Sequence, residues 1–286
     1  MNHEIKRLTP GLYFVATPIG TARDITLRAL DVLASADVIA AEDTRSLRRL
    51  LEIHGVPLNG RQVLAYHDHS SAGARAKILA LLEAGKSVAY ASEAGTPLIA
   101  DPGYHLSKEA SDAGHLVTTT PGASAVVSAL TLAGLPTDAF FFEGFLPNST
   151  SARKTKLDAL REIPGTLVFY ESPKRLADML RDAAAVLGPD RSAAVCREIT
   201  KKFEEVKRGT LDSLATELKG ASVKGEIVVL VDRAGAQEMG QDDIADAVRK
   251  ALETMSVRDA AETVAQATGQ NKRKIYALAL ELKSSK

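Results

Sequence analysis

Four stretches rich in small and turn-forming residues each follow a short apolar run in the first half of the chain. In open α/β sheets, ligands bind outside the carboxyl ends of the strands, which is where these stretches would lie. Glycines there let a ligand approach the backbone, and a helix N-terminus is a ready partner for a carboxylate. The stretches are 17–20 (TPIG), 41–45 (AEDTR), 92–103 (SEAGTPLIADPG) and 120–125 (TPGASA). These residue types favour a binding crevice for a small molecule.

Each stretch also has a plain structural interpretation. The 17–20 stretch alone is typical of a tight turn, Asp43 could cap the helix that follows it, and Ser124 could simply pack. The loop at 92–103 is the strongest signal, because long loops without secondary structure are often functional. The stretch after the first strand does not read G-x-G-x-x-G, which disfavours a dinucleotide cradle and a Rossmann oxidoreductase.

The elements that would position these loops alternate between strand and helix. Strands with helices between them predict a parallel sheet covered on both faces. A break at Leu135-Pro136 suggests a first domain at 1–136. Its expected strands are 12–16, 38–41, 63–66, 87–91 and 116–119, and its expected helices are 25–33, 44–54, 72–84, 106–113 and 122–133.

The rest of the chain predicts a second α/β domain at 137–234 and a helical domain at 241–286. Two strands with little between them, 192–197 and 204–208, suggest an antiparallel hairpin and hence a mixed sheet. The polar stretch 148–155 is expected to be a loop before a short helix. The last domain contains three expected helices at 244–252, 256–267 and 272–282, and either a helix-turn-helix shape or a packed helical hairpin fits them.

Composition excludes some classes of protein. Thirty-six basic and 36 acidic residues cancel, so any nucleic-acid binding must rest on local clusters of charge. The single cysteine, Cys196, cannot form an internal disulfide and lies in an apolar run typical of a buried strand. A lone thiol fits a reducing environment, so we expect a cytoplasmic protein. We find no secretory signal pattern and no apolar run of the roughly 20 residues needed to span a membrane.

Taken together, the loops and several later stretches resemble a known family. The order of these strings resembles the tetrapyrrole-methylase superfamily, and in particular the ribosomal RNA small-subunit methyltransferase I family. Two positions depart from the usual pattern of that family: Glu93 stands where it has Asp, and Thr21 where it has Asn. The supporting stretches are 17–20, 40–45, 67–69 (HDH), 94–103, 121–122, 135–136, 143–147 (EGFLP), 169–172 (FYES), 197–201 (REITK) and 224–226 (KGE).

The resemblance implies an S-adenosylmethionine site in a cleft between two α/β domains, with a small helical domain appended. The reaction implied is methyl transfer to the ribose 2'-hydroxyl of a cytidine in small-subunit (16S) ribosomal RNA. It also implies a homodimer, and no metal is needed. The cofactor-binding residues it implies are Pro18, Gly20, Ala94, Gly95, Thr96, Pro97, Asp101, Pro121, Gly122, Ser124, Tyr170, Glu171 and Gly225.

A 2'-hydroxyl is a weak nucleophile, so a general base within hydrogen-bond reach would help. Asp43 and His67 are the candidates, since both follow strands that face the expected cleft. A helix-capping role for Asp43 and a hydrogen bond between His67 and Asp68 are the alternatives. A splayed-out cytidine would also need a stacking partner such as Tyr104 or Phe145.

RNA binding would come from local clusters of positive charge, although such runs often only face solvent. One further cluster, Arg153, Lys154 and Lys156, lies in the expected polar loop. The residues favoured for RNA contact are Arg45, Arg48, Arg49, Arg197, Lys201, Lys202, Lys272 and Arg273.

Two other functions stay open at the level of sequence. The same fold could methylate a small molecule such as a tetrapyrrole, which predicts cationic pockets inside the cleft. A non-catalytic RNA-binding or ribosome-assembly factor would retain the fold and bind the methyl donor weakly or not at all.

Overall fold

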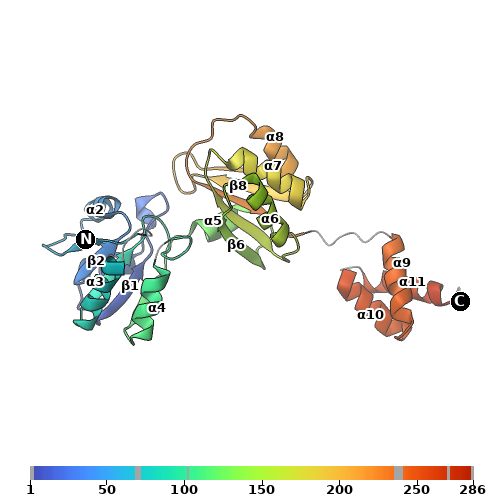
Figure 1. Ribbon diagram of the computed structural model, residues 1–286, viewed down its shortest axis with the longest axis horizontal. Helices are drawn as coiled ribbons and strands as arrows, with labels where there is room; N and C mark the ends of the chain where they lie inside the picture. The colour runs from blue at the N-terminus through green and yellow to red at the C-terminus, as the bar shows by residue number, and fades with distance from the viewer. Residues whose placement is uncertain (1–2, 68–71, 102, 235–240, 269–270, 285–286) are drawn as a thin grey trace.

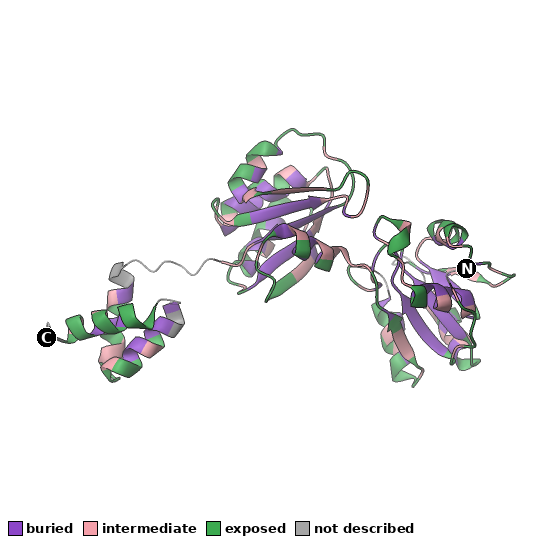
Figure 2. Cartoon of the chain, turned by 180° about the vertical axis from the view of Figure 1, so that it is seen from behind, coloured by how far each residue is buried: buried purple, intermediate pink, exposed green. Residues whose placement is uncertain are grey.

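The computed structural model of the protein describes residues 3–67, 72–101, 103–234, 241–268 and 271–284. Figure 1 presents them as two α/β units followed by a bundle of helices. Buried residues concentrate in the strands of both sheets and on the inner sides of the helices (Figure 2). The expected fold class, a parallel sheet, a mixed sheet and a small helical domain, is confirmed.

The first unit is a parallel sheet with helices on both faces. Its elements are β1 (Gly11–Val15), η1 (Ala22–Asp24), α1 (Leu27–Ser35), β2 (Val38–Ala41), α2 (Thr44–Ile53), β3 (Val63–Ala65), α3 (Ala72–Glu83), β4 (Ser87–Ala91), α4 (Tyr104–Asp112) and β5 (Val117–Thr120). The strand order is β3-β2-β4-β1-β5, and every pair is parallel. Because successive residues of a strand face opposite sides, Leu12 packs towards α3 and α4, while Tyr13 packs towards α1 and α2. Because all five strands are parallel, their carboxyl ends lie at the same edge of the sheet.

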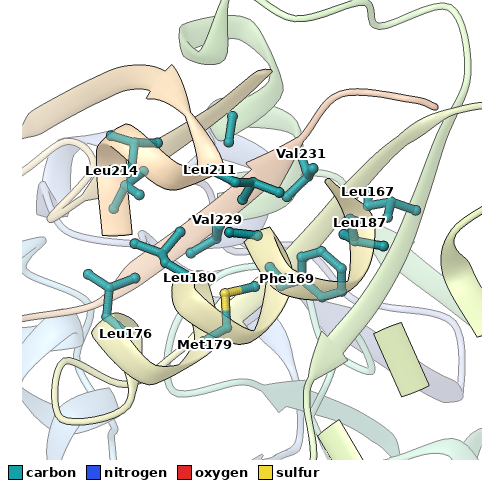
Figure 3. Close-up of a cluster of buried hydrophobic side chains, with 14 of the residues drawn as sticks. Leu167, Phe169, Leu176, Met179, Leu180, Leu187, Leu211, Leu214, Val229 and Val231 are labelled. Atoms are coloured by element: carbon teal, nitrogen blue, oxygen red, sulfur yellow. The ribbon is translucent and has the colours of Figure 1, made fainter. Parts of the chain in front are cut away.

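The second unit is a mixed sheet covered on one face by three helices. Its elements are β6 (Phe140–Phe145), α6 (Thr150–Leu160), β7 (Thr166–Glu171), α7 (Leu176–Leu187), β8 (Ser192–Arg197), β9 (Glu205–Thr210), α8 (Leu211–Glu217) and β10 (Ile227–Val231). The strand order is β6-β7-β10-β8-β9, with β6 parallel to β7 and the other pairs antiparallel. The β8–β9 hairpin expected from the sequence is present. Figure 3 shows the core under α7 and α8, where Phe169, Met179 and Leu211 meet.

Helix α5 (Ala125–Ala133) follows β5 in the chain but packs on the second sheet. Its apolar side, including Val126, Ala129 and Leu130, contacts the face that α6–α8 leave open. The buried thiol of Cys196 lies in this interface and approaches the carbonyl of Ala129 at 3.9 Å. The chain therefore begins to pack on the second sheet at α5, before the break at 135–136. The range 1–136 that the sequence predicts for the first domain thus includes a helix that packs on the second sheet.

The stretch 148–155 is not the expected loop, because most of it forms the first turns of α6. The Ser149 hydroxyl caps this helix by accepting from the Ala152 amide at 3.4 Å. Arg153 is buried, and its Nε and Nη2 donate to Asp182 Oδ2 at 2.8 and 2.6 Å. A buried ion pair with a neighbouring helix is a tertiary contact that local composition does not reveal. Arg153 is consequently not available to RNA.

Three helices at the C-terminal end enclose a core of their own. They are α9 (Gln241–Leu252), α10 (Val257–Thr268) and α11 (Lys272–Ser284). Val248, Ala261, Ile275 and Ala279 meet between them, which agrees with the three helices expected from the apolar pattern. Within the described ranges, no helix combines the length and the apolarity that crossing a bilayer requires.

Candidate active site

A cleft of about 680 Å³ lies between the first and second units. The first unit contributes the loops after β1, β2, β4 and β5. The second unit contributes the ends of β6 and β7, the segment after β8 and the start of β10. Because β10 runs antiparallel to β7 and β8, its first residues lie beside their last residues. The cleft therefore lies between the carboxyl edge of the first sheet and the facing edge of the second.

The loops of the first unit are tied to one another through the backbone. Thr17 and Gly95 exchange two backbone hydrogen bonds, at 2.9 and 3.0 Å. The Thr96 hydroxyl donates to the Ala123 carbonyl at 3.0 Å, which joins the loop after β4 to the one after β5. A Cβ on Gly122 would lie 2.7 Å from the Cβ of Ala16, so only glycine permits this approach. The wall on this side is preorganised and consists largely of backbone and small side chains.

The loop after β4 stores backbone strain beside the cleft. Leu98 and Ala100 have φ angles of +72° and +57°, in the left-handed region that side chains other than glycine seldom adopt. Such residues cluster at ligand sites, where the surrounding structure fixes them. At the start of α5, the Ser124 side chain makes no capping hydrogen bond. Ser124 and Ala125 line the cleft, so the unpaired amides at the start of this helix can receive a carboxylate.

Aromatic rings form part of the opposite wall. Tyr170, at the end of β7, packs edge-on against Phe142 and Phe145, with ring centroids 4.9 and 5.7 Å apart. Burial raises the pKa of the Tyr170 hydroxyl to about 12, and the charges of Asp101 and Glu226 add to this effect. The phenol is therefore neutral at physiological pH. The Phe145 ring is 56 % exposed at the cleft and offers a stacking surface.

Glu171 follows Tyr170 and is only 3 % exposed. Its Oε1 accepts from the Ser172 amide at 2.7 Å and lies 3.3 Å from Arg175 Nε. Its Oε2 is buried and has no hydrogen-bond partner among the described residues. Burial is the main reason why the pKa of this carboxyl is raised. A buried acceptor without a donor is costly, so a ligand hydroxyl or amino group in the cleft would complete it.

The segment after β8 connects the two units. The Thr21 amide donates to Thr200 Oγ1 at 3.2 Å, and the Thr21 hydroxyl donates to the Thr200 carbonyl at 2.5 Å. Glu198 and Thr200 have φ angles of +51° and +66°, so this segment is also strained. Lys201 lines the cleft, and its Nζ lies 2.9 Å from Glu198 Oε1 and 3.1 Å from Glu226 Oε2. The threonine at position 21, where the resembled family has Asn, takes part in the contact between the units.

Glu93 is the cleft carboxylate with the least engaged side chain. Its carboxylate forms no hydrogen bond or ion pair within the part of the chain that the structure describes, while its backbone amide donates to Glu42 Oε2 at 3.2 Å. Partial burial raises the pKa of the Glu93 carboxyl above its ordinary value. The neighbouring carboxylates of Glu42, Asp43 and Glu226 raise it further, because each disfavours a second negative charge. Glu93 is thus more basic than an ordinary carboxylate.

Most of the residues expected to bind the cofactor line the cleft. The three that do not are Pro97, Pro121 and Gly122, which belong to the same loops. Those that do are Pro18, Gly20, Ala94, Gly95, Thr96, Asp101, Ser124, Tyr170, Glu171 and Gly225.

The two expected proton acceptors lie outside the cleft lining. Asp43 is the N-cap of α2, and its Oδ1 accepts from the amides of Arg45 and Ser46 at 2.7 and 3.2 Å. These hydrogen bonds lower the pKa of the Asp43 carboxyl, which weakens it as a base. His67 is exposed after β3, and its expected partner Asp68 lies outside the described residues. The geometry therefore favours the capping role for Asp43.

The residues expected to contact RNA fall into three groups. Arg45, Arg48 and Arg49 are exposed on α2, beside Glu42 and Ser46 of the cleft lining. Arg197, Lys201 and Lys202 lie at the β8–β9 connection, on the other side of the cleft. Lys272 and Arg273 begin α11 in the separate helical bundle, where Lys272 pairs with Glu262 at 2.7 Å. Only the first two groups border the cleft.

Some residues that line the cleft are not among those predicted from the sequence. Glu93 is absent from the expected site residues, although its loop is among the four that the sequence singles out. Glu226 and Val228 were missed because composition does not reveal the direction of β10, which brings its start to the cleft. No local signal would have identified Ile199, since the strained backbone around it depends on contacts with the first unit.

Known proteins resemble both this fold and this sequence. The family described as Tetrapyrrole (Corrin/Porphyrin) Methylases matches residues 11–215, and the RsmI C-terminal HTH domain matches residues 238–283. Among solved structures, cobalt precorrin-4 methyltransferase has a TM-score of 0.60 at 18% identity and covers 77% of this chain and 94% of its own. Diphthine synthase has a TM-score of 0.60 at 18% identity, with coverages of 77% and 89%. At such low identity these likenesses establish the fold alone.

Sequence relatives are much closer. A protein of Mesorhizobium japonicum named ribosomal RNA small subunit methyltransferase I is 48% identical over 279 residues, covering 97% of this chain and 94% of its own length. A protein of Escherichia coli O157:H7 with the same name is 43% identical over 275 residues, covering 94% of each chain. The chain therefore belongs to the tetrapyrrole methylases and, within that fold, to the ribosomal RNA small subunit methyltransferase I family.

Proposed function

We propose that this protein transfers a methyl group from S-adenosylmethionine to the ribose 2'-hydroxyl of a cytidine in small-subunit (16S) ribosomal RNA. The observation that carries this proposal is the cleft, which combines a backbone-lined wall with a wall of rings and charges and has basic clusters on both sides. Methyltransferases related at 43–48% identity support the RNA substrate. A ribosomal substrate implies a cytoplasmic protein.

The residues of the cleft fit the methyl donor. The amides at the start of α5 would receive its carboxylate, and the unpartnered Glu171 Oε2 would accept a hydrogen bond from its nucleoside. When bound, S-adenosylmethionine supplies a methyl group attached to a sulfonium, which is a good leaving group. The ties between Thr17 and Gly95 and between Thr96 and Ala123 hold the loops in place before binding. This preorganisation aligns the reacting groups and excludes water.

Glu93 would accept the proton of the 2'-hydroxyl. It lines the cleft, its carboxylate is free of protein partners within the described residues, and its pKa is raised. A base with a pKa nearer the working pH accepts a proton more effectively. Asp43 and His67, the bases expected from the sequence, do not line the cleft.

The RNA would lie across the cleft between α2 and the β8–β9 connection. Arg45, Arg48 and Arg49 would contact phosphates on one side, and Arg197, Lys201 and Lys202 on the other. The exposed ring of Phe145 would stack on the target cytosine. The helical bundle, matched by the RsmI C-terminal HTH domain, would add phosphate contacts through Lys272 and Arg273 at the start of α11.

Domain organisation and assembly belong to the same proposal. We propose three domains, 1–136, 137–234 and 241–286, with α5 of the first reaching across to the sheet of the second. We also propose a homodimer. Edge strand β6 supports it, because the rings of Phe140 and Phe141 are 48 % and 38 % exposed there. Light scattering of the purified full-length chain would measure its mass in solution.

The deciding experiment compares small-subunit RNA from cells with and without this protein. Nucleoside mass spectrometry should detect the loss of one 2'-O-methylcytidine in the deletion strain, restored by the wild-type gene. Calorimetric titration with S-adenosylmethionine should give saturable binding. An unchanged profile together with methylation of a porphyrinoid in vitro would favour a small-molecule substrate. Donor binding that is absent would favour a non-catalytic RNA-binding factor.

A further inference from the structure

A second hollow, of about 440 Å³, lies in the second unit next to the cleft. Its floor is apolar and includes Leu176, Val195 and Leu218. Its rim carries Arg197, Lys207 and Lys224 together with Glu205 and Glu217. Basic groups outnumber acidic ones along this lining, which suits an anionic ligand with an apolar part.

The most unusual residue of the hollow is Phe203, in the connection between β8 and β9. Its side chain is 64 % exposed although it is large and apolar. The ammonium of Lys202 lies 5.5 Å from the centroid of its ring, which is a cation–π distance. An exposed ring beside a cation is the arrangement on which single-stranded nucleic acids stack their bases.

Ion pairs hold two of the rim cations in place. Arg197 Nε lies 3.1 Å from Glu205 Oε2, and its Nη1 donates to the Lys224 carbonyl at 3.3 Å. Lys207 Nζ lies 2.5 Å from Glu217 Oε1 and 3.6 Å from Glu205 Oε1. By contrast, Lys224 is exposed and forms no ion pair within the part of the chain that is described. Lys202 and Lys224 are therefore the cations most available to a phosphate.

The hollow and the cleft share the same two segments of chain. Along the first segment, Ile199 and Lys201 line the cleft, whereas Arg197 and Phe203 line the hollow. Along the second, Gly225 lines the cleft and its neighbour Lys224 lines the hollow. A polymer with one unit in the cleft can therefore continue over these segments into the hollow.

We propose that this hollow binds an unpaired nucleotide of the RNA substrate adjacent to the methylated one. Its base stacks on Phe203, and its phosphate lies near Lys202 and Lys224. The inference rests on the proposed function, because the target nucleotide must occupy the cleft. An acidic peptide with an aromatic side chain has related chemistry. RNA is favoured because the hollow continues the cleft in which a nucleotide would react.

The test uses two substitutions that separate a flat ring from mere apolar bulk. Phe203→Leu keeps an apolar side chain and removes the ring, whereas Phe203→Trp keeps a flat ring. Neither changes a residue of the cleft. The probe is a fluorescently labelled single-stranded oligocytidylate of five nucleotides, titrated with the full-length protein and followed by anisotropy. The melting temperature and the affinity for S-adenosylmethionine are measured on the same samples.

Phe203→Leu should weaken oligocytidylate binding at least about fivefold, because stacking on an aromatic ring contributes strongly to binding each base. Phe203→Trp should bind as the wild type does, and both variants should bind the methyl donor normally. With unmodified small subunits, Phe203→Leu should raise KM and leave kcat unchanged.

Equal binding by all three proteins would overturn the inference, and so would equal weakening in both variants. It would also be overturned if wild type fails to bind the oligonucleotide, or if an acidic aromatic peptide displaces it more strongly than unlabelled RNA does. Failure of the wild type to methylate small subunits would instead count against the proposed function, which the binding measurement does not use.

Discussion

The two walls of the cleft present different chemical groups. The first unit presents backbone and small side chains, held by hydrogen bonds such as those between Thr17 and Gly95. The second unit presents the ring of Tyr170, the buried carboxylate of Glu171 and the ion-paired Lys201. Backbone groups can bind a ligand whatever side chains a protein carries. Side chains can take different roles in different members of a fold. The comparison implies that substitutions on the two walls act through different physical causes.

Glu93 is one of three acidic side chains on the first wall, with Glu42 and Asp101, and its substitution should have the largest effect. Glu93→Gln should lower the rate of methyl transfer in a single turnover about 100-fold, because general-base catalysis commonly contributes that much. Glu93→Asp keeps a carboxylate and should recover most of the rate. The wild-type rate should rise with pH through the raised pKa of Glu93, since the base must lose its proton, and this rise should be absent in Glu93→Gln. Equal rates in Glu93→Gln and the wild type would mean that Glu93 is not the proton acceptor.

A matched pair of glycines tests how far the second wall depends on its side chains. Gly225 and Gly220 both lie between α8 and β10 and have φ angles of +94° and +73°. A Cβ on Gly225 would overlap the carboxylate of Glu198, whereas a Cβ on Gly220 would meet nothing within 4 Å. Gly225→Ala should displace Glu198 and with it Lys201, lowering the affinity for S-adenosylmethionine.

Gly220→Ala introduces the same kind of backbone strain, on the order of 1 kcal/mol, without the overlap. Calorimetric titration should therefore find normal donor affinity in Gly220→Ala and reduced affinity in Gly225→Ala. Similar donor affinities in the two variants would mean that the Glu198–Lys201 pair has no part in shaping the cleft.

The contrast between the walls also explains what the sequence could predict. The loops after β1, β4 and β5 could be predicted because their signals lie in consecutive residues. Glycines, prolines and the start of a helix can be recognised directly in the sequence. Glu226 and Ile199 reach the cleft only because β10 reverses direction and the units touch at Thr21 and Thr200, which are tertiary facts. Arg153 shows the same limit, since its burial depends on Asp182 from another helix.

Glu171 offers a pH-dependent test of the second wall. A carboxyl whose pKa is raised by folding favours the protonated form, so folding stability falls as pH rises from the ordinary pKa of glutamate to the raised one. Glu171→Gln cannot ionise. Its free energy of unfolding should therefore rise relative to that of the wild type as the pH increases above the ordinary pKa of glutamate. Urea unfolding at a series of pH values measures the difference. A constant difference would mean that Oε2 already has a partner in the folded protein in solution.

The smallest effect is expected at Asp43, and it separates a structural role from a catalytic one on the first wall. The carboxylate accepts from the amides of Arg45 and Ser46, so Asp43→Ala leaves the start of α2 uncapped. The melting temperature should fall by about 2–4 °C, the change that loss of one such cap produces in a chain of this size. Asp43→Ser can still cap the helix and should melt close to the wild type, while the methylation rates of both variants stay near normal. A rate that collapses in Asp43→Ser without a change in melting temperature would instead identify Asp43 as the proton acceptor. The first wall would then supply its base from a helix cap rather than from the loop after β4.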